Sequence, residues 1–291
     1  MRSILEQTTK PDEIIVVDDG ALEEVPFREE CEAEGIHCIY HRKETRGLTA
    51  SRNAGIRLAA GDVLFFLDDD VVLFDSYIAE ILQTYAAEKE PPVMGVGGLI
   101  ANTKPLTRSK RLRYYLDRLF LVAGPQEGRV LQSGFSTDYG TTNNPVTEVM
   151  DVDFLPGGVC SYKKEVFDEF SFSEKYRGYG MGEDKDFSYR VSRRYRLVVN
   201  PAAKLYHYES PKMRFDKAQE TREIVMGRYN LFRDYVKRTR FDWFFFVYAL
   251  FGYFLGRVLI CCFAPGAANL KRIGGVLMAL RDILLGRTAI H

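Results

Sequence analysis

Acidic side chains directly follow two apolar segments of the chain. Residues 13–17 (EIIVV) run into residues 18–20 (DDG), and residues 63–67 (VLFFL) run into residues 68–70 (DDD). If both segments are strands of one parallel sheet, their carboxyl ends lie at the edge where open α/β sheets bind ligands. Crowded carboxylates repel each other unless a cation lies among them. The pattern therefore predicts a divalent cation, Mg²⁺ or Mn²⁺, shared with phosphate oxygens, although each cluster could also be a solvated turn.

Two further segments carry groups that could do chemistry. Glu183 and Asp184 open a segment with the pattern of a helix, and His207 follows a segment with the pattern of a strand. A positioned carboxylate can accept the proton of a reacting hydroxyl, and an imidazole is a common metal ligand. Helix capping would explain the acidic pair equally well on residue type alone, and a structural role would explain the histidine.

Alternating strands and helices must position these groups. Strands are expected over residues 13–17, 36–40, 63–67, 94–100 and 196–199, and helices over residues 22–34, 49–60, 76–89, 109–122, 164–170, 183–194 and 216–237. This alternation predicts an α/β fold with a mostly parallel sheet flanked by helices on both faces. Because a helix-like segment precedes residue 13, we expect that a first strand is missing ahead of it.

Five stretches of the chain resemble glycosyltransferase family 2, in the order and at the spacing of that family. They are SILEQTTKPDEIIVVDDG (3–20), RGLTASRNAGIRLAAGDVLFFLDDD (46–70), FLPGGVCSYKKEVF (154–167), GYGMGEDKDFSYRV (178–191) and LYHYES (205–210). The resemblance implies the A-type nucleotide-sugar fold (GT-A). It also implies three regions: a nucleotide-sugar-binding half over 1–100, an acceptor-binding and catalytic half over 101–215, and a helical C-terminal region over 216–291.

The resemblance assigns nucleotide and metal contacts to the first half of the chain. Asp19 matches the family acid that binds the nucleotide base, and Arg52 resembles a basic residue near the nucleotide. Asp68, Asp69 and Asp70 match the Asp-x-Asp motif. Asp68 and Asp69 are then expected on the nucleotide side, with Asp68 toward the ribose, and Asp70 is expected to bind the metal.

The resemblance assigns the remaining roles to the second half. Gly157 and Gly158 resemble a turn that lets the backbone approach the donor sugar and the acceptor. Asp184 matches the position of the catalytic base, with Glu183 beside it, and His207 matches a histidine near the metal. One base without a second nucleophilic carboxylate implies direct displacement with inversion.

The reaction implied is transfer of a sugar from a nucleotide-sugar donor to a hydroxyl of a saccharide or lipid-linked acceptor, in cell-surface polysaccharide or glycolipid synthesis. Two alternatives stay open. An Asp-based phosphotransferase or phosphatase also places Asp-x-Asp after an apolar strand, but it leaves residues 182–186 (GEDKD) unexplained. A membrane-associated scaffold with a degenerate transferase fold would fit the missing first strand.

The C-terminal region contains an apolar stretch, residues 243–264, in which Arg257 is the single charge. Its length suffices to span a bilayer, but basic residues flank it on both sides, which disfavours a single crossing. We expect a helix in or on the membrane interface, followed by an amphipathic helix over residues 272–285, at the cytoplasmic face of the cell membrane. A helix buried in the fold or in a homodimer interface is the alternative.

Composition limits the remaining partners. The 291 residues contain 40 basic and 40 acidic side chains, so the chain lacks the positive excess of a nucleic-acid-coating protein, and no nucleic acid partner is expected. The five cysteines have neither CxxC nor Cys/His spacing, which indicates reduced thiols and no zinc site.

Overall fold

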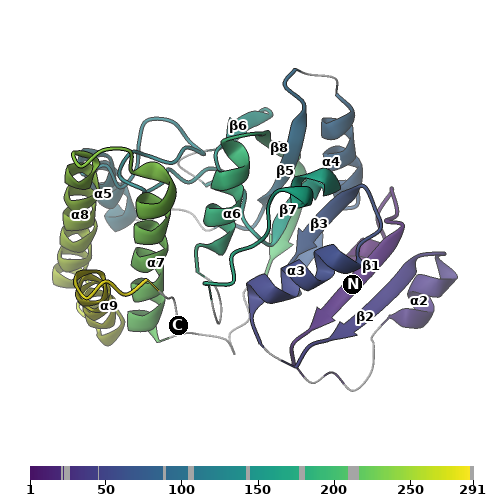
Figure 1. Cartoon of the computed structure of the whole chain (residues 1–291), viewed down its shortest axis with the longest axis horizontal. Helices are drawn as coiled ribbons and strands as arrows, with labels where there is room; N and C mark the ends of the chain where they lie inside the picture. Colours follow the sequence, from purple (N-terminus) through teal and green to yellow (C-terminus); the bar gives the residue numbers. More distant parts are fainter. Residues whose placement is uncertain are drawn as a thin grey trace. The chain divides into compact units, whose positions relative to one another are not determined.

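The computed structural model describes residues 1–20, 22, 27–44, 46–87, 90–103, 108–141, 145–176, 181–208 and 216–288. The chain divides into two compact units: Met1–Asn102 with Val146–Glu209, and Thr103–Pro145 with Ser210–His291. The first unit contains the sheets and the second is mainly helical (Figure 1). The bounds of these units differ from the three regions expected from the sequence, and the functions expected of those regions remain a prediction.

The first unit is built from short strands and helices. Its strands are β1 (Glu13–Asp18), β2 (His37–Arg42), β3 (Val63–Leu67), β4 (Val71–Leu73), β5 (Val93–Ile100), β6 (Met150–Val152), β7 (Val159–Lys163) and β8 (Arg196–His207). Its helices are α1 (Arg2–Leu5), α2 (Arg28–Ala33), α3 (Leu48–Leu58), α4 (Tyr77–Ala86), the 3₁₀ helix η1 (Lys164–Asp168) and α6 (Glu183–Ser192). β4, β6 and β7 were not expected from the sequence, and β8 extends eight residues beyond the expected strand.

The strands form two sheets. β1 and β2 pair in parallel, and the larger sheet has the order β3-β7-β5-β8-β4, with β6 also on β8. Within that sheet β5 and β8 are parallel, whereas β3 with β7, β5 with β7, β4 with β8 and β6 with β8 are antiparallel. The expected α/β class is confirmed, but the sheet is mixed rather than mostly parallel. A helical connection permits parallel strands but does not require them: β7 and β8 are connected through α6, and relative to β5 they run in opposite directions.

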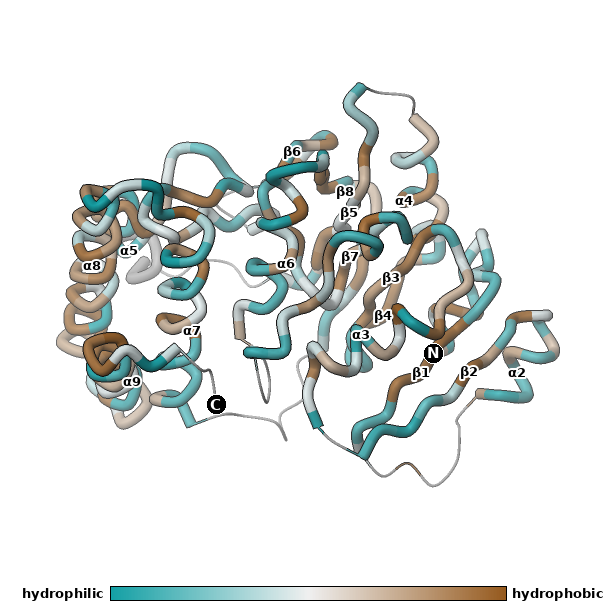
Figure 2. Tube along the Cα trace, viewed as in Figure 1, coloured by the Kyte–Doolittle hydropathy of each residue, from teal (hydrophilic) through white to brown (hydrophobic). Residues whose placement is uncertain are grey.

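Helices cover both faces of the larger sheet. On one face, Tyr77 and Ile81 of α4 pack with Val96 and Val198 in an apolar cluster. On the other face, the ring of Phe187 in α6 lies 5.1 Å from the ring of Tyr162 in β7, centroid to centroid. Figure 2 shows the matching pattern, with hydrophobic residues concentrated along the central strands.

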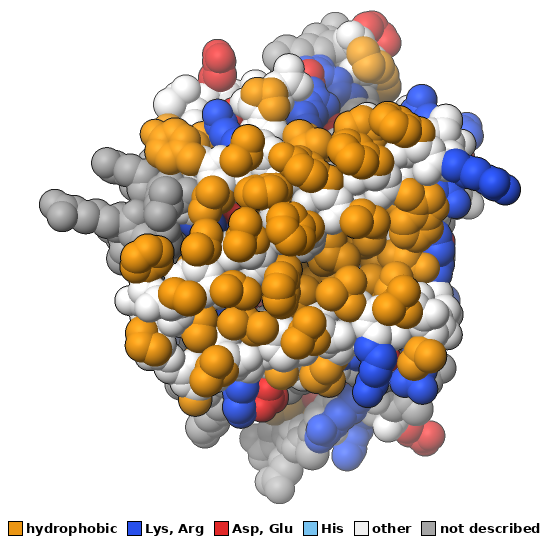
Figure 3. All heavy atoms as spheres, turned by 90° about the vertical axis from the view of Figure 1, so that its left-hand side faces the viewer, with side chains coloured by type: hydrophobic (Ala, Val, Ile, Leu, Met, Phe, Trp, Pro, Cys, Tyr) orange, Lys and Arg blue, Asp and Glu red, His pale blue; other side chains and the backbone are white. Residues whose placement is uncertain are grey.

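The second unit consists of the helices α5 (Arg108–Leu119), α7 (Lys217–Leu231), α8 (Asp242–Phe263) and α9 (Ala267–Leu284), and α7 continues into the π-helical turn Phe232–Val236. α8 packs against α5 and α9, and α7 packs against α9. Small residues allow these contacts, since a Cβ on Gly252 would lie 2.0 Å from the Cβ of Phe120. Figure 3 looks onto this unit and shows apolar side chains gathered on one face.

Asn53 connects α3 to the segment that precedes α6. Its Nδ2 donates to the carbonyl of Phe172 at 2.9 Å, and its Oδ1 accepts from the N–H of Phe172 at 3.0 Å. The side chain therefore satisfies both backbone groups of Phe172, as a neighbouring strand would. Asn53 is buried, so its side chain serves as a structural link between the two segments.

We expect Asn53→Ala to lower the free energy of unfolding by about 3 kcal/mol, because it leaves the N–H and C=O of Phe172 unpaired in the interior. Urea unfolding followed by circular dichroism measures this. Arg57→Ala is the matched control: the residue is exposed on the same helix, and its loss should cost less than about 0.5 kcal/mol. Equal effects of the two substitutions would contradict the structural role of Asn53.

Candidate active site

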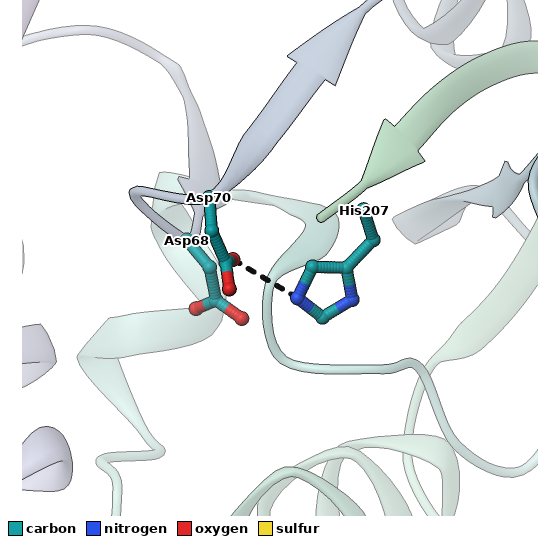
Figure 4. Close-up of side chains that lie close together, drawn as sticks. All are labelled: Asp68, Asp70 and His207. Atoms are coloured by element: carbon teal, nitrogen blue, oxygen red, sulfur yellow. Dashed lines mark ion pairs between the residues drawn. The ribbon is translucent and has the colours of Figure 1, made fainter. Parts of the chain in front are cut away.

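Two carboxylates and an imidazole meet where β3 and β8 end and β4 begins. One ligand atom from each of Asp68, Asp70 and His207 lies within 4.8 Å of the others, and Asp70 Oδ1 is 2.9 Å from His207 Nε2 (Figure 4). β3 ends just before Asp68, β4 begins just after Asp70, and His207 is the last residue of β8. Two strand ends and one tight connection therefore position all three groups.

The pairing of β4 with β8 brings His207 to the aspartates. The two strands are antiparallel with Val71 opposite His207, and the N–H of Tyr208 donates to the carbonyl of Asp70 at 2.9 Å. The sequence predicted the histidine but not this strand. The sequence signal for this strand is a short apolar run of β-forming residues, VVL at 71–73, directly after the aspartates.

The cluster has the donor chemistry of a divalent-cation site. Its side chains are partly exposed, so two carboxylates and a nitrogen are available to an ion from solvent. Burial raises the pKa of Asp68, and Arg52 and His207 act in the opposite direction. Carboxylates suit Mg²⁺ and Mn²⁺, and the added imidazole favours Mn²⁺. Asp69 is exposed and is not part of this three-residue group.

Arg52 is a buried cation behind the cluster. Its guanidinium lies 2.5 Å from Glu183 Oε1 and 3.8 Å from Asp68 Oδ1, and it stacks 5.3 Å above the ring centroid of Phe172. Burial raises the pKa of Glu183, and the neighbouring Arg52 guanidinium opposes this by stabilising the ionised carboxylate. Both partners are less than 10% exposed, so Arg52 and Glu183 form an internal ion pair.

Gly157 and Gly158 make room for these charged side chains. A Cβ on Gly157 would lie 2.6 Å from the Arg52 guanidinium nitrogens, and a Cβ on Gly158 would lie 2.0 Å from Asp68 Oδ2. The sequence analysis expected the two glycines to bring the backbone close to bound sugars. The structure shows a different close approach, to the chain's own side chains, and the sugar contacts remain a prediction.

Asp184 lies on the other side of the same loop. Its Oδ2 accepts from the N–H of Gly157 at 3.3 Å, and its place in the first turn of α6 leaves it partly exposed. Glu183, one residue earlier, points instead to the buried Arg52. The two adjacent carboxylates therefore differ in availability, and only Asp184 can meet a molecule from solvent.

Asp19 is not part of the three-residue group and contacts the start of α3 instead. Its Oδ2 accepts from the N–H of Gly47, the residue that precedes α3, at 2.9 Å. Arg52 lies one turn further along the same helix. Asp18 is occupied elsewhere: the hydrogen bond from Tyr40 and the backbone N–H groups of Gly20 and Leu22 lower its pKa. Asp19 therefore holds the helix that carries Arg52 toward Asp68.

A family model described as "Glycosyl transferase family 2" matches residues 1–169, more than half of the chain. The chain belongs to glycosyl transferase family 2. One relative, the glucosyl-dolichyl phosphate glucuronosyltransferase of Haloferax volcanii, is 26% identical over 168 residues, which are 57% of this chain and 47% of the relative. The chain thus spans about half the length of this curated relative.

Solved structures share the fold of this family 2 chain. The mannosyltransferase PcManGT from Pyrobaculum calidifontis, in complex with GDP-Man and Mn²⁺, aligns with a TM-score of 0.56 at 15% identity, over 97% of this chain and 82% of that chain. GalNAc-T7 with UDP, GalNAc and Mn²⁺ aligns with a TM-score of 0.53 at 16% identity, over 99% of this chain and 54% of that chain. The GT-A fold expected from the sequence is therefore confirmed.

We expect Gly158→Ala to weaken Mn²⁺ binding about 10–100-fold, because the added methyl group must displace the Asp68 carboxylate. Titration calorimetry with MnCl₂ on the folded variant measures this. Gly61→Ala is the matched control, since a Cβ there would meet Glu13 Oε1 at an ordinary 3.5 Å. If Gly158→Ala binds Mn²⁺ as the wild type does, Asp68 is not a ligand.

Proposed function

We propose that this chain is an inverting glycosyltransferase of the hexosyltransferase type, which moves a sugar from a nucleotide-sugar donor to an acceptor hydroxyl. The observation that carries the proposal is the loop over residues 156–158. Gly158 packs against Asp68 of the cation cluster, and Gly157 donates to Asp184. Two adjacent glycines thus contact Asp68, a carboxylate of the cation cluster, and Asp184, a carboxylate that could act as a base. A single displacement requires such a pair, with a cation at the leaving group and a base at the attacking hydroxyl.

The donor would bind at the cation cluster. Asp68, Asp70 and His207 would hold Mn²⁺ or Mg²⁺, which when bound neutralises charge on a diphosphate leaving group. We place the nucleotide along the path from Asp69 to Asp19, at the start of α3. Asp19 keeps one oxygen on Gly47, so its other oxygen can accept from a nucleotide base.

Asp184 would act as the general base. Its carboxylate takes the proton of the acceptor hydroxyl while that oxygen bonds to the anomeric carbon of the donor. The bond from this carbon to the diphosphate breaks on the opposite side, and the nucleoside diphosphate leaves. The neighbouring Glu183 is held by Arg52 and is not free to attack the sugar, which supports direct displacement with inversion.

Glu183 and Arg52 take positioning roles in this scheme. Arg52 is buried and reaches Asp68 rather than solvent, so it would orient the cation cluster instead of contacting the nucleotide directly. Glu183 would fix the guanidinium in place. From the sequence, Arg52 was expected on the nucleotide and Glu183 among the catalytic groups. Their burial supports this revised assignment.

The acceptor is proposed to be a saccharide or a lipid-linked sugar, in cell-surface polysaccharide or glycolipid synthesis at the cytoplasmic membrane face. One relative is named for glucosyl-dolichyl phosphate, whose dolichyl group is a lipid. Membership of family 2 and the GT-A fold favour transfer over the phosphotransferase alternative.

Donor binding should depend on the cation cluster. In a thermal-shift panel of nucleotide sugars, at least one donor should raise the melting temperature by about 5 °C at hundredfold excess over its Kd, with Mn²⁺ or Mg²⁺ but not with EDTA. Asp70→Asn and His207→Ala should abolish this shift. Asp75→Asn, an exposed aspartate just past β4, should keep it. If no nucleotide shifts the wild type, the non-catalytic scaffold is the better interpretation.

Asp184→Asn should reduce transfer about 10²–10⁴-fold while leaving donor affinity within about twofold, because the amide cannot accept the hydroxyl proton. Turnover is measured by nucleoside diphosphate release and affinity by calorimetry on the same sample. Asp186→Asn is not a suitable control, since Asp186 is buried in ion pairs with Lys175 and Arg190. Asp168→Asn, on η1, is suitable. Equal loss of donor binding and transfer would refute the base assignment.

A further inference from the structure

The second unit carries a broad exposed apolar face. Large apolar side chains that are more than one third exposed come from three of its helices and their ends. They are Tyr115 and Leu119 of α5, Phe241, Phe244, Val247, Phe251 and Phe263 in and beside α8, and Leu270, Leu277, Met278, Leu284 and Leu285 in and beside α9. Figure 3 shows apolar side chains covering this face, with Lys and Arg at its periphery. Monomeric soluble proteins rarely expose so continuous an apolar area.

Helix α8 has two distinct sides. Its buried side includes Phe246, Ala249 and Tyr253, which follow helical spacing and pack within the unit. Its exposed side includes Phe244 and Phe251, 57% and 56% exposed. Arg257, the one charge inside the apolar stretch, donates to the hydroxyl of the buried Tyr253 at 2.7 Å. The exposed side is therefore apolar along the helix.

Contacts with α5 argue against a membrane-spanning α8, although it is the one described helix that is long and apolar enough to cross a bilayer. The middle of α8 contacts α5, where Gly252 packs on Phe120 and Tyr253 lies 5.6 Å from the Arg113 guanidinium. A crossing α8 would carry the charges of α5, including Asp117, to the bilayer centre. Each such charge costs about 2.5–3.5 kcal/mol there.

Exposed charge around this face is positive. Residues 237–288 contain eight basic and two acidic residues. Both acids are buried: Asp242 is 4% exposed and accepts from backbone N–H groups, and Asp282 is 1% exposed and pairs with Arg222. The exposed basic residues are Lys237, Arg238, Arg240, Lys271, Arg281 and Arg287. The first three directly precede α8 and carry most of the positive charge. Lys271 lies in α9 and pairs with Asp216, and Arg281 and Arg287 both contact Asp282.

We propose that this face docks onto an anionic lipid bilayer, with α8 lying in the plane of the interface and its exposed side in the acyl region. The basic groups that precede α8, together with those of α9, would bind lipid headgroups on one side of the bilayer. A two-fold dimer through this face would set identical basic borders against each other, which favours lipid over a second copy. The inference rests on the membrane location in the proposed function and specifies the surface that achieves it.

Vesicle flotation of the full chain tests the docking surface. Binding to vesicles of phosphatidylcholine with 30% phosphatidylglycerol should exceed binding to phosphatidylcholine alone at least about tenfold, given the basic border. Phe244→Glu with Phe251→Glu should reduce binding about tenfold or more, because two exposed rings are lost from the acyl region. Val149→Glu, at an exposed apolar residue in the first unit, should bind as the wild type does. Equal binding by the double variant would overturn the proposal.

Trp243, the single tryptophan of the chain, reports the orientation of α8. Lipids brominated at shallow or deep acyl positions quench tryptophan according to its depth. In the in-plane arrangement, a tryptophan introduced by Trp243→Phe with Phe251→Trp should be quenched best by the shallow lipid. Trp243 itself packs against Phe232 and Phe246 on the buried side and should be quenched less. A helix that spans would place position 251 near the bilayer centre, so deep quenching there would overturn the in-plane arrangement.

Sedimentation velocity distinguishes lipid from a second copy. The double variant should have the same oligomeric state as the wild type. A wild-type dimer that dissociates in the double variant, without vesicle binding by either protein, would overturn the proposal in favour of self-association. None of these measurements uses a sugar donor, so their failure would leave the transfer reaction untouched.

Discussion

The buried guanidinium of Arg52 is the interaction on which the first unit's site depends. It lies between Glu183 at the start of α6 and Asp68 at the end of β3, and the two glycines of the 156–158 loop fit against it and its partner Asp68. Removing either partner of a buried ion pair leaves an uncompensated charge, typically at a cost of about 3–5 kcal/mol. One cation thus ties together a helix, a strand end and a loop that are far apart in the sequence.

This arrangement also separates the roles of similar side chains. Glu183 and Asp184 are adjacent, yet the helix start turns one toward the interior and the other toward solvent and Gly157. Asp68 and Asp70 differ likewise, since Asp68 lies close to the buried Arg52 and Asp70 contacts His207. The environment, not the residue type, determines which carboxylate can bind a cation, take a proton or serve only as a partner for arginine.

The second unit follows a different constraint. Two acidic side chains, Asp242 and Asp282, are buried in this unit and are satisfied by hydrogen bonds and ion pairs. Large aromatic and aliphatic side chains, in contrast, are exposed on its surface. Hydrophobic burial within the unit is therefore incomplete, which is the reverse of an ordinary soluble helical bundle. A lipid bilayer surface would cover the exposed apolar side chains and would pair the basic residues around them with anionic headgroups.

The sequence by itself determined the local elements and the identity of the reactive groups. Helical periodicity predicted α3 and a long apolar run predicted α8, each within two residues. An acidic cluster after an apolar strand pointed to Asp68 and Asp70, and an acidic pair that opens a helix pointed to Asp184. It could not determine the direction of β7, the short strand β4 or the pairing of β4 with His207, because strand pairing depends on contacts between distant segments. Only the tertiary structure decided that Arg52 and Glu183 are buried together and that α8 has an exposed apolar side. Burial is a property of the packed chain, and the residue pattern of one segment does not specify its neighbours.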